Sequence, residues 1–190
     1  MQHQMSTTAA RLKLTYDDYL LFPEDGRRHE LVDGEHRVTP APDTRHQLLS
    51  FRLSGRLFEY LSAHPVGQAL AAPCDVKLSE TDVVQPDVLF VSRERSGIVR
   101  QAAIDGPPDL VVEILSASTR RMDEQLKRNL YAKHGVAEYW IVDPDLETVR
   151  VWRRGTPGFE LVRELAAERG EAVTTPLLPG LRIELASLFG

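Results

Sequence analysis

A run of branched apolar residues with one carboxylate inside it is the clearest pattern in the chain. Residues 107–116 read Pro-Pro-Asp-Leu-Val-Val-Glu-Ile-Leu-Ser, so Glu113 interrupts an otherwise apolar segment. Unbroken apolar runs of this kind are typical of central strands that are covered on both faces. A charge buried there is costly without a partner. We therefore expect a compensating group beside Glu113.

A second strand with an internal carboxylate is predicted at residues 83–91, Val-Val-Gln-Pro-Asp-Val-Leu-Phe-Val. If the two strands lie side by side, Asp87 and Glu113 can hold Mg²⁺ or Mn²⁺, and the carbonyl of Ile114 could add a third oxygen ligand. Such an ion lowers the pKa of bound water and stabilises charge on a phosphoryl oxygen. The alternative is a structural ion pair between Glu113 and Lys127 or an arginine, and burial alone does not decide between them.

Helical periodicity predicts two long helices. The first begins at a capping box formed by Thr44 and Gln47 and ends before Pro65. Its apolar stripe comprises Leu49, Leu53, Leu57 and Leu61, widened by Phe51 and Phe58. The second spans residues 119–134 and is closed by Gly135 in the left-handed conformation, with Met122, Leu126 and Leu130 as its apolar stripe. Lys127 is then expected at the border of that buried face.

Shorter alternating segments predict the remaining strands. We expect them at 28–32 and 35–39, joined by Asp33-Gly34, at 75–78 in a hairpin with 83–91, at 139–142 and 148–152, and at the edges within 159–165 and 172–185. A short helix opens at Thr15, and residues 92–109 read as a loop with a helical turn near 98–103. This order predicts an α/β (α+β) fold with a mixed central sheet, a long helix on each face, and a parallel unit around the 119–134 helix.

Length and composition favour a single domain. We place it at residues 15–190, after an N-terminus of residues 1–14 that we expect to be disordered. The single cysteine, Cys74, excludes an intrachain disulfide and a cysteine-based zinc site, which favours a reducing cytoplasm. The sequence contains neither a signal peptide nor an apolar run long enough for a membrane span.

The formal charge of -5 and the pI near 5.7 argue against a protein that coats nucleic acid non-specifically. Contact with a phosphate backbone would need a local basic patch. The 119–134 helix offers one, with Arg120, Arg121, Lys127, Arg128 and Lys133 against Asp123 and Glu124. A charge run of this kind is also commonly a solvated face.

Three further side chains are candidates for the site. Lys127 could orient the attacking water or offset charge on the scissile phosphate, or it could be a solvated partner of Asp123 one turn earlier. Glu30 could complete the metal shell or accept a proton from metal-bound water, or it could be an exposed hairpin glutamate. His46 lies in the first turn of a helix, where the dipole disfavours a charged imidazole. It could accept a hydrogen bond or bind metal, or it could be an ordinary polar residue there.

Several enzyme classes are excluded by missing motifs. The sequence has no Gly-rich phosphate loop, no nucleophile elbow and no His-Glu-x-x-His pattern. P-loop nucleotide hydrolases, serine hydrolases and zinc proteases are therefore disfavoured, and we expect no nucleotide cofactor.

A series of ordered blocks resembles a large bacterial family named "putative restriction endonuclease", whose members have the restriction-endonuclease-like fold of the PD-(D/E)XK nuclease superfamily. The blocks are His29-Glu-Leu-Val-Asp-Gly-Glu35, His46, Gln85-Pro-Asp-Val88, Pro108-Asp-Leu-Val-Val-Glu-Ile-Leu-Ser-Ala-Ser-Thr119, Asp123 with Lys127 and Tyr131, and Gly135-Val-Ala-Glu-Tyr-Trp-Ile-Val-Asp-Pro144. The resemblance runs from about Tyr16 to Phe189.

By this resemblance, Asp87 follows the proline of the superfamily's Pro-Asp element, and Glu113 is its second acidic position. The superfamily pattern then has a lysine two residues later, where this chain has Leu115. Lys127, which enters from the following helix, is the candidate to replace it. Glu30 and His46 match the glutamate of the family's Glu-Leu-Val-Asp-Gly block and its helix-start histidine.

The resemblance implies a Mg²⁺- or Mn²⁺-dependent phosphodiesterase that acts on DNA with water as nucleophile. Such folds commonly form homodimers, which would cut both strands. No segment reads as a separate target-recognition domain. The alternative is a catalytically inactive nuclease fold that binds nucleic acid or protein.

Overall fold

A six-stranded mixed sheet forms the centre of the computed structural model, which describes residues 12–190. Its strands run in the order β11-β10-β9-β8-β6-β3, with only β8 and β9 parallel among neighbours. Their bounds are β3 Gly67–Ala71, β6 Val88–Ser92, β8 Leu110–Ile114, β9 Glu138–Asp143, β10 Thr148–Gly155 and β11 Gly158–Ala166. The parallel pair confirms the predicted crossover unit.

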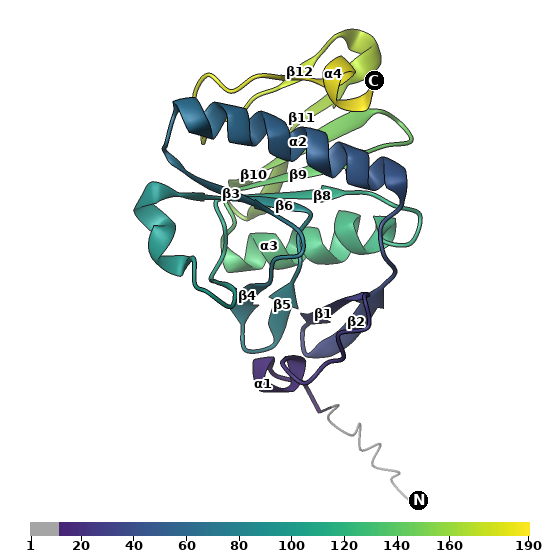
Figure 1. The fold of residues 1–190 in the computed structure, drawn as a ribbon, viewed down its shortest axis with the longest axis vertical. Helices are drawn as coiled ribbons and strands as arrows, with labels where there is room; N and C mark the ends of the chain where they lie inside the picture. The colour runs from purple at the N-terminus through teal and green to yellow at the C-terminus, as the bar shows by residue number, and fades with distance from the viewer. Residues whose placement is uncertain (1–11) are drawn as a thin grey trace, which may run out of the picture.

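The two long helices cover opposite faces of this sheet (Figure 1). Helix α2 spans Thr44–Ala63, and the second helix consists of a π-helical segment, η2 (Met122–Lys127), followed by α3 (Arg128–His134). Gly135 ends α3 with a φ of 89°, the left-handed conformation that favours glycine. A mixed sheet with a long helix on each face is therefore confirmed.

A smaller five-stranded sheet, in the order β2-β1-β5-β4-β7, lies on the α3 side of the molecule (Figure 1). Its strands are β1 Arg28–Val32, β2 Glu35–Thr39, β4 Val76–Ser79, β5 Asp82–Val84 and β7 Ile104–Asp105. The β1–β2 hairpin pairs with β5 at one ladder position, Leu31 opposite Val83, and the Asp33 and Gly34 amides of its turn donate to Asp82 Oδ1 and the Thr81 carbonyl. Helix α1 (Tyr16–Tyr19) packs beside it.

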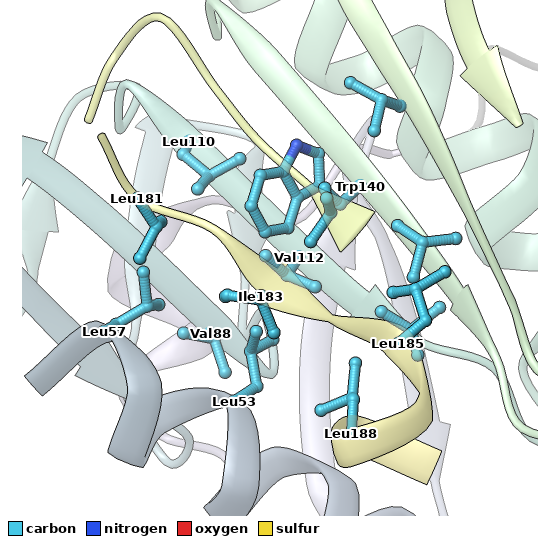
Figure 2. Close-up of a cluster of buried hydrophobic side chains, with 14 of the residues drawn as sticks. Leu53, Leu57, Val88, Leu110, Val112, Trp140, Leu181, Ile183, Leu185 and Leu188 are labelled. Carbon is cyan, nitrogen blue, oxygen red and sulfur yellow. The ribbon is translucent and has the colours of Figure 1, made fainter. Parts of the chain in front are cut away.

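The remaining elements are short. They are η1 Arg93–Ile98, η3 Ala167–Arg169, β12 Ala172–Val173, β13 Ile183–Glu184 and α4 Leu185–Phe189. Figure 2 shows Leu53 of α2, Ile183 and Trp140 meeting in one buried cluster. The C-terminal segment thus helps α2 to cover its face of the large sheet.

The predicted strand 83–91 is wrong as a single element. It breaks at residues 85–87, so β5 belongs to the small sheet and β6 to the large one. Pro86 explains the break, because it cannot donate a ladder hydrogen bond. The sequence also gave no sign of β3, which pairs with β6 as an edge strand.

Two details of helix α2 differ from the prediction. Its N-cap is Asp43, whose carboxylate accepts a hydrogen bond from the His46 amide, rather than Thr44. Phe51 and Phe58 do not widen the buried stripe, since they are 78% and 75% exposed. Leu49, Leu53 and Leu57 are buried as predicted.

The buried face of the 119–134 helix also differs from the prediction. Met122 and Leu126 are half-buried, whereas Asp123, Lys127 and Tyr131 are fully buried. Lys127 is therefore inside the protein rather than at the border of the buried face. These polar side chains can be buried because they have polar partners in the fold.

The expectation of a disordered segment at 1–14 falls mostly on residues 1–11, which lie outside the described residues. At the end of that segment, the Leu14 amide donates to the Gly34 carbonyl, 3.0 Å away. No helix within residues 12–190 is both long and apolar enough to cross a membrane.

Candidate active site

The register between β6 and β8 brings Asp87 and Glu113 together. Val88 lies opposite Val112 in this antiparallel pair, so the next residues outward are Asp87 and Glu113. The Ile114 amide donates to Asp87 Oδ2 over 2.7 Å. Asp87 is 1% exposed and Glu113 is 2% exposed. The two carboxylates thus share a buried position at the end of the strand pair.

Three groups surround the Asp87 carboxylate. Arg28 Nη1 lies 2.5 Å from Oδ1, and His46 Nε2 lies 3.0 Å from Oδ2, where the Ile114 amide also binds. Burial raises the pKa of Asp87, but the hydrogen bond and charge of His46, the charge of Arg28 and the Ile114 amide outweigh it. The pKa of Asp87 therefore lies below its ordinary value, and this carboxylate is ionised.

The ammonium of Lys127 lies among three carboxylates. Its Nζ is 2.9 Å from Glu30 Oε1, 3.0 Å from Glu113 Oε1 and 3.6 Å from Asp123 Oδ1. Burial lowers the pKa of Lys127, but the three negative charges raise it well above its ordinary value. Lys127 is therefore a permanent buried cation.

Glu113 and Asp123 are difficult to ionise here. Burial raises the pKa of Glu113 well above its ordinary value, and Asp123, Asp87 and Glu30 raise it further, while Lys127 opposes them. Burial is also the main cause that raises the pKa of Asp123 to about 6. The Tyr131 hydroxyl donates to Glu113 Oε1 over 2.7 Å. Within residues 12–190, both hydrogen bonds to the Glu113 carboxylate thus fall on Oε1.

Strand alternation explains how the small sheet supplies two site residues. Arg28 and Glu30 are two positions apart on β1, so their side chains point to the same face, toward the site. His29, between them, contacts Asp25 and His36 instead. The backbone amide of Gln85 donates to Glu30 Oε1 over 2.8 Å and fixes that carboxylate at the boundary between the two sheets.

These side chains line a cavity of about 220 Å³. Its ionisable lining comprises five carboxylates (Glu30, Asp43, Asp87, Glu113 and Asp123), His46, and the two cations Arg28 and Lys127. Asp123 Oδ1 and His46 Nδ1 are buried without a hydrogen-bond partner among the described residues. An excess of crowded carboxylates with raised pKa values is the environment in which a hard divalent cation is favourable.

The donor set fits Mg²⁺ or Mn²⁺ held by a few protein oxygens and several waters, the usual arrangement for these ions. Among residues 12–190, no three His, Cys, Asp or Glu side chains converge on one metal-sized point. An ion between Asp87 and Glu113 would therefore take part of its shell from backbone oxygen or water. The Ile114 residue lines the cavity, and its carbonyl as a ligand stays a prediction.

The structure gathers all of the residues selected from the sequence in this one cavity. Glu30 is 1% exposed, so the interpretation of Glu30 as an exposed hairpin glutamate is wrong. Lys127 is 3% exposed, so the interpretation of Lys127 as a solvated partner of Asp123 is wrong as well. His46 is buried and contacts Asp87. Glu113 and Lys127 form the ion pair that the structural alternative predicted. This ion pair is compatible with both a structural and a catalytic role of Glu113.

Three site residues were missing from the candidates. Arg28 contacts Asp87, while Asp123 and Tyr131 contact the Lys127–Glu113 pair. Spacing could have found them, because Arg28 precedes Glu30 by two strand positions and the other two lie one helical turn on either side of Lys127.

Comparison with known proteins agrees with this architecture. A crystal structure from Anabaena variabilis, described as a "putative nuclease belonging to DUF820", superposes with a TM-score of 0.78 at 22% sequence identity, over 93% of this chain and 97% of that one. It shows the shared fold. A search of curated proteins finds no match. The Uma2 family model, described as "Putative restriction endonuclease", matches residues 16–186. Since that match spans most of the sequence, the chain belongs to the Uma2 family.

Proposed function

We propose that this protein is a metal-dependent endodeoxyribonuclease that hydrolyses phosphodiester bonds with water as the nucleophile. The observation that carries the proposal is the meeting of Asp87, Glu113 and the Lys127 ammonium at one cavity. Two strand-borne carboxylates and a helix-borne cation are the groups that such a reaction needs at a phosphate. Membership in a family with a nuclease description supports the same reaction class.

Asp87 and Glu113 would hold Mg²⁺ or Mn²⁺, with the Ile114 carbonyl as a further ligand. The bound ion would supply an acidified water and a positive charge beside the phosphoryl oxygens. Asp87 is suited to this role because its lowered pKa keeps it charged. The second oxygen of Glu113, Oε2, accepts no hydrogen bond within residues 12–190, which leaves it available to a cation.

Lys127 is a permanent cation of the site, held by Glu30 and Glu113. In that position it can orient the attacking water or offset charge that develops on the scissile phosphate. It thereby replaces the lysine of the PD-(D/E)XK pattern, where this chain has Leu115. Glu30 would accept a proton from metal-bound water, and His46 keeps the Asp87 carboxylate oriented.

The direct test is nicking of supercoiled plasmid by the purified protein with Mg²⁺, Mn²⁺ or EDTA. Wild type should nick in either metal and not in EDTA, and Asp87→Asn should be inactive while its circular dichroism spectrum is unchanged. Glu94→Gln, a neutralised carboxylate on η1 outside the cavity, is the matched control and should retain activity. Nicking by Asp87→Asn at the wild-type rate contradicts the proposal.

A second candidate function is an inactive nuclease fold that binds nucleic acid or protein. The observation in its favour is the set of internal partners: Lys127 and Arg28 already neutralise Glu113 and Asp87. Under this alternative, Mg²⁺ would not raise the melting temperature of wild type. A metal-dependent rise that is lost in Asp87→Asn would exclude it.

Pairing of two copies would let the enzyme cut both DNA strands. Helix α2 supports a homodimer because Leu48, Phe51 and Phe58, spaced three and seven residues apart, are 47%, 78% and 75% exposed. Light scattering of wild type and of a Phe51→Ser/Phe58→Ser variant tests this: a dimer that becomes a monomer supports the pairing, and a monomeric wild type contradicts it.

A further inference from the structure

A second cleft opens from the active-site cavity between strand β2 and the beginning of the π-helical segment η2. It has a volume of about 770 Å³ and shares Thr39, Ser118 and Met122 with the lining of the cavity. The two spaces are therefore continuous. A molecule whose phosphate occupied the cavity could extend along this cleft.

The lining of the cleft is cationic in an acidic protein. It contains Arg37 and Arg121 together with His36, and no Asp or Glu is among its lining residues. The whole chain has a formal charge of -5. An exclusively cationic set of charged residues beside a carboxylate-rich cavity indicates a binding surface for an anion.

One wall of the cleft is a row of unused hydrogen-bonding side chains. Arg121, Gln125 and Asn129 are four residues apart, the first directly before η2, the second in η2 and the third in α3, and all three are exposed. Their side chains make no hydrogen bond or ion pair with any part of the chain that the structure describes. The other wall is β2, where Arg37 Nη2 donates to Glu35 Oε2 over 2.9 Å while its buried Nε has no hydrogen-bond partner among residues 12–190.

We propose that this cleft binds the polynucleotide backbone on one side of the scissile phosphate, with Arg121 and Arg37 as its phosphate contacts and Gln125 and Asn129 as neutral donors. Arginine and amide side chains are the usual partners of phosphate and sugar oxygens, and they fix the register of a strand without reading its sequence. The proposal rests on the nuclease function and adds the path of the substrate away from the site.

The test is the salt dependence of DNA binding, measured by fluorescence anisotropy of a labelled oligonucleotide duplex with Ca²⁺ in place of Mg²⁺. Each phosphate that the protein contacts with a cation adds about one unit to the magnitude of the slope of log K against log [NaCl]. Arg121→Gln and Arg37→Gln should each lose about one unit of slope, and the double variant about two. Arg100→Gln is the matched control, because Arg100 is an exposed arginine that forms no ion pair within residues 12–190 and lies outside the cleft lining.

A double variant with the wild-type slope overturns the proposal, as does an equal loss in Arg100→Gln or a wild type that does not bind the duplex. The result is separate from that of the nicking assay. If wild type nicks plasmid but the slopes are unchanged, the cleft assignment fails and the nuclease function stands. If the slopes fall as expected and no metal supports nicking, the cleft stands and the nuclease function fails.

Discussion

Lys127 Nζ and Glu113 Oε1 are 3.0 Å apart, and the two side chains are only 4% and 2% exposed. An ion pair this deeply buried has lost its hydration on both sides, so removal of the lysine charge leaves the buried carboxylates around it uncompensated. Glu30 and Asp123 share the same ammonium. The electrostatics of the site therefore depend on one lysine that serves three carboxylates.

Replacing this lysine by an apolar side chain of similar length should be severe. We expect Lys127→Met to lower the free energy of unfolding by about 3–5 kcal/mol at pH 7, because three buried carboxylates lose their cation. Part of the loss should disappear at pH 5, where the carboxyl groups with raised pKa values can be protonated. Urea unfolding followed by circular dichroism measures both values.

Lys133→Met is the matched control for this experiment. Lys133 is on the same helix, but its side chain is 62% exposed and its Nζ lies 3.4 Å from Asp82. It should cost no more than about 1 kcal/mol. Equal losses in the two lysine variants would mean that the burial of the Lys127 ammonium has no energetic effect.

The pKa of Asp123 predicts a specific dependence of stability on pH. This pKa is 3.8 in the ordinary state and about 6 in the fold, so the folded protein loses stability relative to the unfolded chain as pH rises from about 4 to 6. Asp123→Asn has no such loss. In EDTA, the stability of the variant relative to wild type should therefore rise by up to about 3 kcal/mol between pH 4 and pH 7. If the free energies of unfolding of the variant and wild type differ by the same amount at pH 4, 5, 6 and 7 in urea titrations, the pKa of Asp123 is not raised in the fold.

Glu113→Gln separates the fold from the chemistry. Glutamine keeps an oxygen for Lys127 and Tyr131 to contact, and the raised pKa of Glu113 means that a neutral side chain is tolerated in the metal-free protein. We expect a melting temperature in EDTA within a few degrees of wild type, but neither nicking nor stabilisation by Mg²⁺. Differential scanning fluorimetry with a Mg²⁺ titration gives the decisive comparison. If Mg²⁺ raises the melting temperature of Glu113→Gln as much as that of wild type, Glu113 is not a metal ligand.

Arg28 would compete with a metal ion held by Asp87, since its guanidinium is 2.5 Å from Oδ1. Removal of this cation should strengthen the attraction of the carboxylate for another one. We expect Arg28→Gln to need a lower Mg²⁺ concentration for half-maximal thermal stabilisation. Arg27→Gln is the control, because Arg27 pairs with Asp25 instead. If Arg28→Gln needs more Mg²⁺ than wild type, Arg28 supports the metal site rather than competing with it.

Local patterns predicted the elements that position the site. Strand β1, the Asp33-Gly34 turn and strand β2 were predicted with the bounds that the structure has, because turn residues and alternation are short-range signals. Strand β8 and the crossover to β9 followed equally from an apolar run and a helix of suitable length. These elements carry Glu30, Glu113 and Lys127 to one place.

Long-range contacts decided what the patterns could not. The 119–134 helix buries the face that carries Lys127, because Lys127 pairs there with Glu30 and Glu113. These two glutamates come from two different sheets. Hydrophobicity alone favoured Met122 and Leu126 instead. The division of residues 83–91 between two sheets is likewise a choice of partner strands, and no local property of the segment specifies those partners.

The candidate site lies at the boundary between the two sheets, and this position gives the site a local stability that differs from that of the whole protein. Arg28 and Glu30 arrive on a hairpin that pairs with β5 at one ladder position, while Asp87 directly precedes β6 and Glu113 lies on β8 of the large sheet. A partial opening that releases this hairpin would dismantle the site while the large hydrophobic core stays folded. Amide hydrogens of β1 should then exchange with solvent earlier than those of β8 and β9, and catalytic competence would be lost on warming before the protein as a whole melts.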